Sequence, residues 1–167
     1  MLLLLFLCGA GAILLQMIVP KLPLVEIHPF LVALPVLYAA MRLKGGGPLA
    51  LALGLGLVID LLSPQKLGTG GFVLCLVVGI AWSQRENLPF DHWGSVAFLA
   101  LVATFGALIA DYALFCWESG TRDWRFILWV RLAWVAVLNA VLAVPFFVLC
   151  DLFLSLRRRG DEEDYAL

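Results

Sequence analysis

Charged residues are scarce in this chain. Of its 167 residues, 14% are Asp, Glu, Lys or Arg and 63% are hydrophobic, and the mean hydropathy is +1.03. A soluble domain carries roughly 25% charged and 45–50% apolar residues, so the composition excludes a soluble fold and indicates an integral membrane protein. The formal net charge is −1, and no long basic stripe accompanies the aromatic residues. Nucleic-acid binding therefore has no support.

Residues that bind metals or carry redox chemistry are also few. The two histidines, His28 and His92, are far apart and flanked by loop residues, so solvated positions are favoured over metal ligation. The cysteines are predicted to be buried and inert. All four lie inside apolar runs without a short-range pair: Cys8, Cys75, Cys116 and Cys150. The sequence therefore implies no metal and no cofactor.

Apolar runs separated by short polar breaks fill most of the chain. A helix that crosses a bilayer needs about 20 apolar residues, so the runs predict an all-α membrane protein, a compact bundle of about six transmembrane helices with short loops. Kinks are expected at Pro35 and Pro145. The expected helices cover about residues 1–19, 30–43, 49–62, 72–83, 94–117 and 132–154, with an interfacial segment at about 124–131 before the last one.

The two ends of the chain differ in character. Residues 1–19 lack a basic residue before the hydrophobic run and a convincing cleavage site, so they are interpreted as a retained helix and not as a signal peptide. Residues 1–156 are predicted to form the transmembrane helical domain. Residues 157–167 are predicted to form a cytoplasmic tail that begins with Arg157–Arg159 and ends in an acidic, disordered segment. Asp151 is placed at the interface near these arginines, and Asn139 is predicted to form a hydrogen bond between helices.

The stretch from Gly54 to Gly71 places a single aspartate, Asp60, at the end of an apolar helix and follows it with a tight loop. A charged side chain in hydrocarbon costs roughly 2.5–3.5 kcal/mol, so Asp60 should face protein and not lipid. Ala52, Gly56 and Asp60 recur at every fourth position, which stacks them on one face that a neighbouring backbone can approach. Asp60 is predicted to accept hydrogen bonds from residues 66–70. Tying down this loop is favoured over partner binding or ion handling, and both readings stay open.

A second aspartate, Asp111, follows Ala103 and Ala107 at the same spacing, as a weak echo of the first. Six helices place both termini on one side, and six basic residues against four favour the cytoplasm for that side. Both aspartates then lie in the half of the membrane away from the cytoplasm, with Arg131 as the counter-charge for Asp111. The six basic residues are Arg42, Lys44, Arg85 and Arg157–Arg159, and the four are Lys21, Lys66, Arg122 and Arg125.

The order Gly-x-Gly-x-x-x-Asp-Leu-Leu-Ser-Pro-x-x-Leu-Gly, from Gly54 to Gly68, resembles the most recognisable stretch of the rod shape-determining protein MreD family. The chain length, the second helix with Pro35 and Tyr38, the short glycine-rich third helix and Arg85 after the fourth helix are similar as well. The resemblance covers about residues 29–85. Beyond residue 85 it rests on helix number and size.

The resemblance implies a non-enzymatic, multi-pass subunit of the bacterial inner membrane that belongs to the cell-elongation (rod) complex. Such a subunit binds MreC, a membrane-anchored periplasmic protein, and through it a glycan polymerase and transpeptidase pair and the actin-like MreB filaments. The helix-three face and the loop after it are the candidate structural or partner-binding positions, together with the second aspartate and its counter-charge. These candidates are Ala52, Gly54, Gly56, Asp60, Ser63, Pro64, Gly68, Asp111 and Arg131.

Two other classes of protein share some of these features. A small transporter or vitamin-uptake substrate-binding subunit would also show about six helices, short interrupted segments and a carboxylate near a pocket. An intramembrane enzyme would need a second catalytic group near Asp60 or Asp111, and none is identifiable from spacing. A non-enzymatic membrane subunit is therefore the leading interpretation, with the transporter subunit as its alternative.

Overall fold

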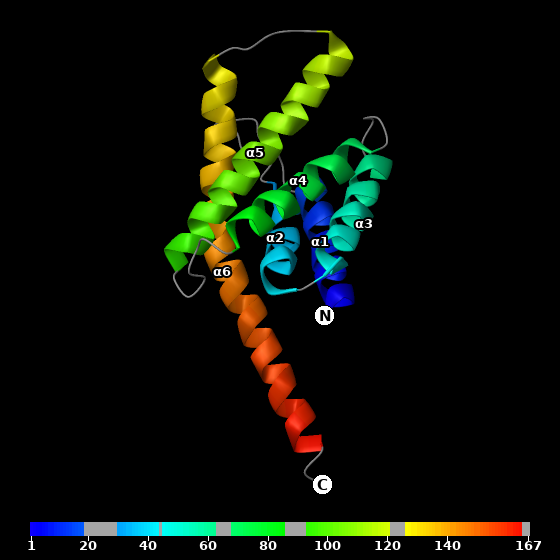
Figure 1. The fold of residues 1–167 in the computed structure, drawn as a ribbon, viewed down its shortest axis with the longest axis vertical. Helices are drawn as coiled ribbons and strands as arrows, with labels where there is room; N and C mark the ends of the chain where they lie inside the picture. The colour runs from blue at the N-terminus through cyan, green and yellow to red at the C-terminus, as the bar shows by residue number, and fades with distance from the viewer. Residues whose placement is uncertain (19–29, 44, 63–67, 86–92, 121–125, 165–167) are drawn as a thin grey trace.

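The computed structural model describes residues 1–18, 30–43, 45–62, 68–85, 93–120 and 126–164, and these residues form six α-helices and no strand (Figure 1). The all-helical prediction is confirmed. Two helices are long and apolar enough to cross a membrane, over Trp93–Trp117 and Leu128–Phe153. The helices are α1 (Leu2–Ile18), α2 (Ala33–Arg42), α3 (Gly47–Leu62), α4 (Thr69–Gln84), α5 (Trp93–Ser119) and α6 (Phe126–Asp164).

Helix α2 is the centre of the bundle and contacts each of the other five helices. Nine of its ten residues, Ala33 to Met41, are buried. A helix that is apolar on all sides is either buried among other helices or spans a membrane. At 1.5 Å per residue α2 is about 15 Å long, which is half the thickness of a bilayer core. It is thus a core helix, too short to cross a membrane by itself.

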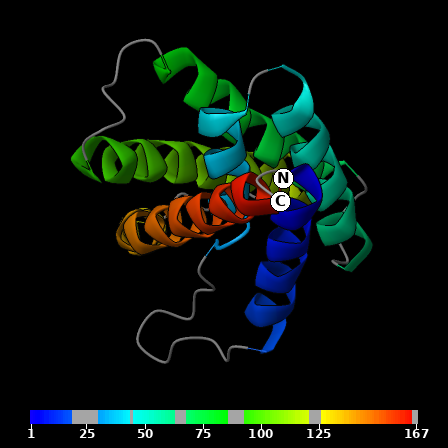
Figure 2. The ribbon, with the colours of Figure 1, turned by 90° about the horizontal axis from the view of Figure 1, so that it is seen from below.

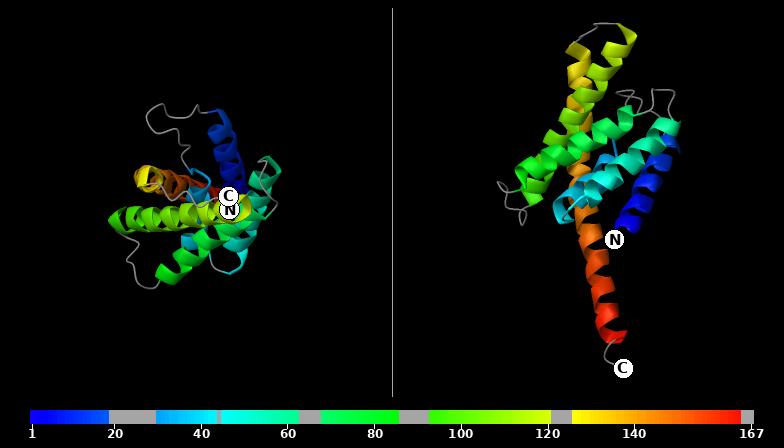
Figure 3. Two further views of the ribbon diagram at one scale, coloured as in Figure 1. Left: turned by 90° about the horizontal axis from the view of Figure 1, so that it is seen from above. Right: turned by 45° about the vertical axis from the view of Figure 1, so that its right-hand side comes forward.

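The longest helices, α5 and α6, pack along each other and rise above the rest of the bundle (Figure 3). Helix α1 packs on α2 and α3. Seen from below, α1 and α6 run in different directions from the end where both termini lie (Figure 2). Within the described ranges, α1 and α6 do not pack against each other.

Three predicted helix boundaries are wrong. Helix α2 begins at Ala33, three residues after the predicted start, so Pro35 is its third residue and lies in the first turn, where no amide donor is needed. Helix α4 begins at Thr69, three residues before the predicted start. Helix α6 is one continuous helix of 39 residues that includes Pro145, without the predicted change from an interfacial to a spanning segment near residue 131.

Helix α6 continues through residue 156 to Asp164. Residues 157–159 are basic and residues 161–163 are acidic, so opposite charges recur four residues apart, a pattern that favours a helix. The division into a transmembrane domain and a cytoplasmic tail stays a prediction. The last three residues, 165–167, lie outside the described part.

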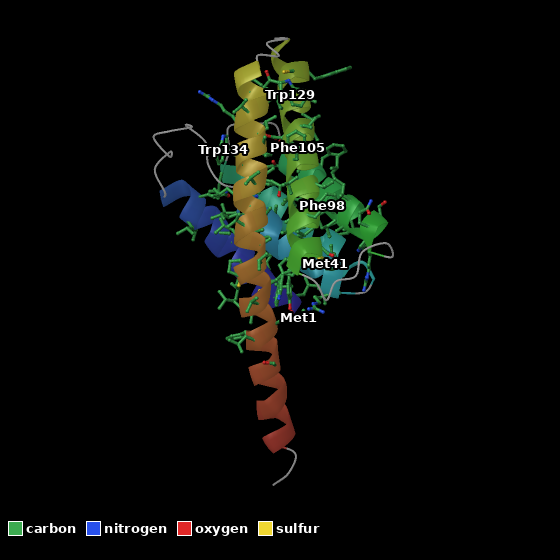
Figure 4. The ribbon with its side chains drawn as sticks, turned by 90° about the vertical axis from the view of Figure 1, so that its left-hand side faces the viewer. Met1, Met41, Phe98, Phe105, Trp129 and Trp134 are labelled. Carbon is green, nitrogen blue, oxygen red and sulfur yellow. The ribbon has the colours of Figure 1, made fainter. Side chains whose placement is uncertain are left out.

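Apolar side chains make up much of the surface of the bundle as well as its core. Among the described residues, 27 large hydrophobic side chains are exposed, including Phe98 of α5 and Trp134 of α6 (Figure 4). The buried polar residues of the same ranges are Asp60, Thr104 and Asn139. Exposed apolar surface of this extent suits apolar surroundings. Cys8 is exposed on this surface, so its predicted burial is wrong.

Candidate functional site

Asp60 lies at the end of α3 and binds the beginning of α4. Its Oδ2 accepts a hydrogen bond of 2.6 Å from the Gly68 amide, and its Oδ1 accepts one of 2.8 Å from the Gly70 amide. The Thr69 hydroxyl lies 3.4 Å from Oδ1. The residue is 3% exposed. The hydrogen bonds predicted from residues 66–70 are therefore present for the described part of that segment.

These bonds make Asp60 a cap that one helix supplies to another. The first amides of a helix have no partner inside it, and a carboxylate there also meets the positive end of the helix dipole. The residue at the N-cap position of α4 is Gly68, with φ +106°, which has no side chain to cap the helix. Asp60 takes over this function from α3. The carboxylate thereby fixes where α4 begins relative to the end of α3 (Figure 1).

Glycine is required where α3 and α4 meet. A Cβ atom at Gly56 would lie 2.2 Å from the Cα of Gly71, and a Cβ at Gly70 would lie 2.7 Å from Oδ1 of Asp60. The two backbones are thus in direct contact beside the carboxylate. This is the close approach that the spacing of Ala52, Gly56 and Asp60 predicts, and all three residues are buried.

The remaining candidates of the motif have different positions. A Cβ at Gly54 would lie 3.3 Å from the ring of Phe6, so Gly54 faces α1 and not α4. Ser63 and Pro64 lie outside the described residues. The motif therefore contributes to two helix contacts of α3, one with α1 and one with α4.

Asp111 and Arg131 are half-buried residues of α5 and α6, which pack against each other. The shared depth of Asp60 and Asp111 in the membrane stays a prediction. The ion pair between Asp111 and Arg131 stays a prediction. His28 and His92 lie outside the described residues, and the rest contain no group of three His, Cys, Asp or Glu side chains that could hold a metal ion.

A second polar cluster joins α2 to α6. The Tyr38 hydroxyl donates a hydrogen bond of 2.6 Å to Oδ1 of Asp151, and Nη2 of Arg42 lies 2.5 Å from Oδ2. Tyr38 is fully buried and packs edge-on against Phe147, with ring centroids 4.9 Å apart. Sequence reasoning assigned Asp151 to the arginines of its own helix and missed both partners. The available signal was the spacing of Tyr38 and Arg42, four residues apart on one helix face.

Asn139 of α6 forms the interhelical hydrogen bonds predicted for it. Its Nδ2 donates to the carbonyl of Phe30 at 2.8 Å and lies 3.4 Å from the hydroxyl of Thr104 on α5. The side chain is fully buried, and its Oδ1 has no hydrogen-bond partner among the described residues. An unpartnered buried acceptor typically costs about 1–3 kcal/mol. A bound group could donate a hydrogen bond to this Oδ1.

Basic residues meet at the C-terminal end of α2. Arg85 follows α4 and donates from Nη1 to the carbonyl of Leu43 at 3.3 Å, directly after Arg42. Cations near the C-terminus of a helix satisfy its free carbonyls and interact favourably with its dipole. Arg42 and Arg85 therefore lie at the same end of the bundle, as the count of charges in the loops requires.

An aromatic pair also joins α5 and α6: the rings of Phe105 and Trp129 have centroids 6.4 Å apart (Figure 4). The α5–α6 contact thus contains both the buried amide of Asn139 and this aromatic pair.

When the chain is compared with known proteins, no family model, no curated protein and no solved structure matches it.

Proposed function

We propose that this protein is a non-enzymatic, multi-pass subunit of the bacterial inner membrane that resembles MreD and docks MreC in the cell-elongation complex. The observation that carries the proposal is the motif from Gly54 to Gly68. Its residues have structural tasks: Gly56 allows backbone contact, and Asp60 caps α4 through Gly68 and Gly70. The carboxylate is occupied by α4, which suits a scaffold better than a catalyst.

The membrane placement in this proposal rests on charge and exposure. The exposed apolar side chains cover all the helices except α2, and α2 is enclosed by the others. Arg42 and Arg85 lie together at one end, to which α6 adds the sequence Arg157–Arg159. By the positive-inside rule this end faces the cytoplasm, together with both termini. The six helices then form one membrane-embedded bundle.

An exposed row of leucines on α3 is our proposed contact for MreC. Leu53, Leu57 and Leu61 recur every fourth residue and are 51%, 52% and 75% exposed. The helix that carries them is fixed to α4 by the Gly56 contact and the Asp60 cap. A rigid row of leucines is a suitable surface for a single transmembrane helix of a partner.

The test is co-purification in a mild detergent from native membranes, read by mass spectrometry. The wild-type chain should retain a bitopic protein with a large periplasmic domain. Changing all three α3 leucines to alanine should reduce this retention by about tenfold. The matched control changes three exposed leucines of α1, Leu3, Leu7 and Leu14, to alanine and should retain the partner. Equal retention by both triple variants would refute the α3 contact, and absence of such a partner from the wild type would refute the function.

A vitamin-uptake or transport substrate-binding subunit is the second candidate. One observation favours it: Oδ1 of Asn139 is buried between α5 and α6 without a partner among the described residues. A solute with a hydrogen-bond donor could bind there. The same purification would then recover a small ligand or an energy-coupling module in place of the bitopic protein.

A further inference from the structure

An apolar groove separates α1 from α6 at the end where both termini lie. Tyr38 of α2 forms the floor between the two diverging helices. The groove has a volume of about 360 Å³. Its lining is apolar and comes from α1 (Met1, Leu4, Leu5, Cys8), α2 (Tyr38) and α6 (Phe146, Leu149, Cys150, Phe153).

The rim of the groove is open to the surroundings of the bundle. Leu149 is 63% exposed, Phe153 56% and Met1 40%. Met1 lies beside the lower half of α6 (Figure 4). On the floor, the only polar group of Tyr38 is its hydroxyl, which is bound to Asp151. The groove therefore offers hydrocarbon contact along its length and no polar group that requires a partner.

A cation stands beside the floor of the groove. Arg42 is one turn after Tyr38 on α2 and shares Asp151 with it. The guanidinium is about half exposed, and one of its five N–H donors is used by Asp151, while the described residues accept from none of the others. Guanidinium groups with free donors bind phosphate oxygens bidentately.

We propose that this groove binds an anionic phospholipid, with an acyl chain between α1 and α6 and the phosphate at Arg42. The positive charge at one end favours the anionic headgroup, and the apolar lining favours the chain. An acyl chain matches this lining because it is apolar along its whole length, and a phosphate matches the half-exposed guanidinium of Arg42. The inference requires the chain to be in a membrane, but it is independent of docking to MreC.

The experiment uses the full chain in nanodiscs that contain equal amounts of phosphatidylglycerol and phosphatidylcholine with the same acyl chains. Native mass spectrometry then counts the lipids retained after release from the nanodisc. The wild type should retain one phosphatidylglycerol in preference to phosphatidylcholine. Cys8→Trp fills the groove and should abolish this retention. The matched control is Leu3→Trp, at a 75% exposed position of α1 outside the lining, and it should behave as the wild type.

Variants at the cation test the headgroup contact. Arg42→Gln alone would leave Asp151 without its cation, so the double variant Arg42→Gln with Asp151→Asn removes both charges together. It should lower phosphatidylglycerol retention about tenfold, the loss expected for a charge-assisted hydrogen bond. Equal retention of both lipids by the wild type would overturn the proposal. Unchanged phosphatidylglycerol retention by Cys8→Trp would also overturn it. So would a result in which Cys8→Trp loses a co-purifying protein and keeps its lipid.

Discussion

Replacing Asp60 by alanine is expected to loosen the start of α4. The carboxylate accepts two backbone amides, from Gly68 and Gly70, at 2.6 and 2.8 Å. Alanine leaves both amides without an acceptor in a partly buried position, at about 1–2 kcal/mol each. A loss of about 2–4 kcal/mol lowers the melting temperature of a chain of this size by about 4–16 °C. Asp60→Asn should be milder, because its single amide oxygen can keep one of the two bonds.

The assay is thermal unfolding of the purified protein in one detergent, followed by fluorescence or by loss of the monodisperse peak. Leu61→Ala is the matched control, since Leu61 is the next residue of α3 and is 75% exposed; its melting temperature should change little. A melting temperature for Asp60→Ala equal to that of the control would refute the capping role. If Asp60→Asn were as damaging as Asp60→Ala, the charge itself would be required, and an ion-pair or proton role would be favoured.

Two further substitutions test the helix contacts. Gly56→Ala places a Cβ 2.2 Å from the Cα of Gly71, so α3 and α4 must separate, and the free energy of unfolding should fall by about 1–3 kcal/mol or more. The control Gly79→Ala, whose Cβ meets nothing within 4 Å, should unfold at or above the wild-type temperature. Equal melting temperatures for the two variants would contradict the α3–α4 contact. Tyr38→Phe removes one hydrogen bond to Asp151 and should cost about 1.5–3 kcal/mol in the same unfolding assay, whereas an unchanged melting temperature would show that the α2–α6 cluster adds no stability.

The sequence was sufficient for the α3–α4 junction because its signal is local. The four-residue spacing of Ala52, Gly56 and Asp60 identified a packed face, and the cost of an exposed charge in lipid required a polar partner nearby in the chain. Where α4 begins was harder to predict. Thr69, Gly70 and Gly71 look like a flexible linker by composition, and they are helical where a carboxylate from another helix satisfies the amides of Gly68 and Gly70.

Contacts between distant segments were beyond reach of the sequence. Tyr38 and Asp151 are 113 residues apart, and nothing local distinguishes Asp151 from an interfacial acid paired with the arginines that follow it. The central position of α2 was missed for a related reason. A short buried helix and a membrane-spanning helix are both apolar, and their lengths distinguish them only when the start of the helix is known. Pro35 was read as a kink because that start was placed three residues too early.

The central position of α2 also has a consequence for biosynthesis. Helix α6 begins at residue 126, 84 residues after α2 ends at residue 42. At a synthesis rate of about 5–20 residues per second, the ribosome needs about 4–17 s to produce that interval. During this time Arg42 has been made and Asp151 has not. The nascent chain therefore passes through a stage in which its central helix lacks its contact with α6, and the membrane-insertion machinery must tolerate an arginine whose acidic partner is still to be translated.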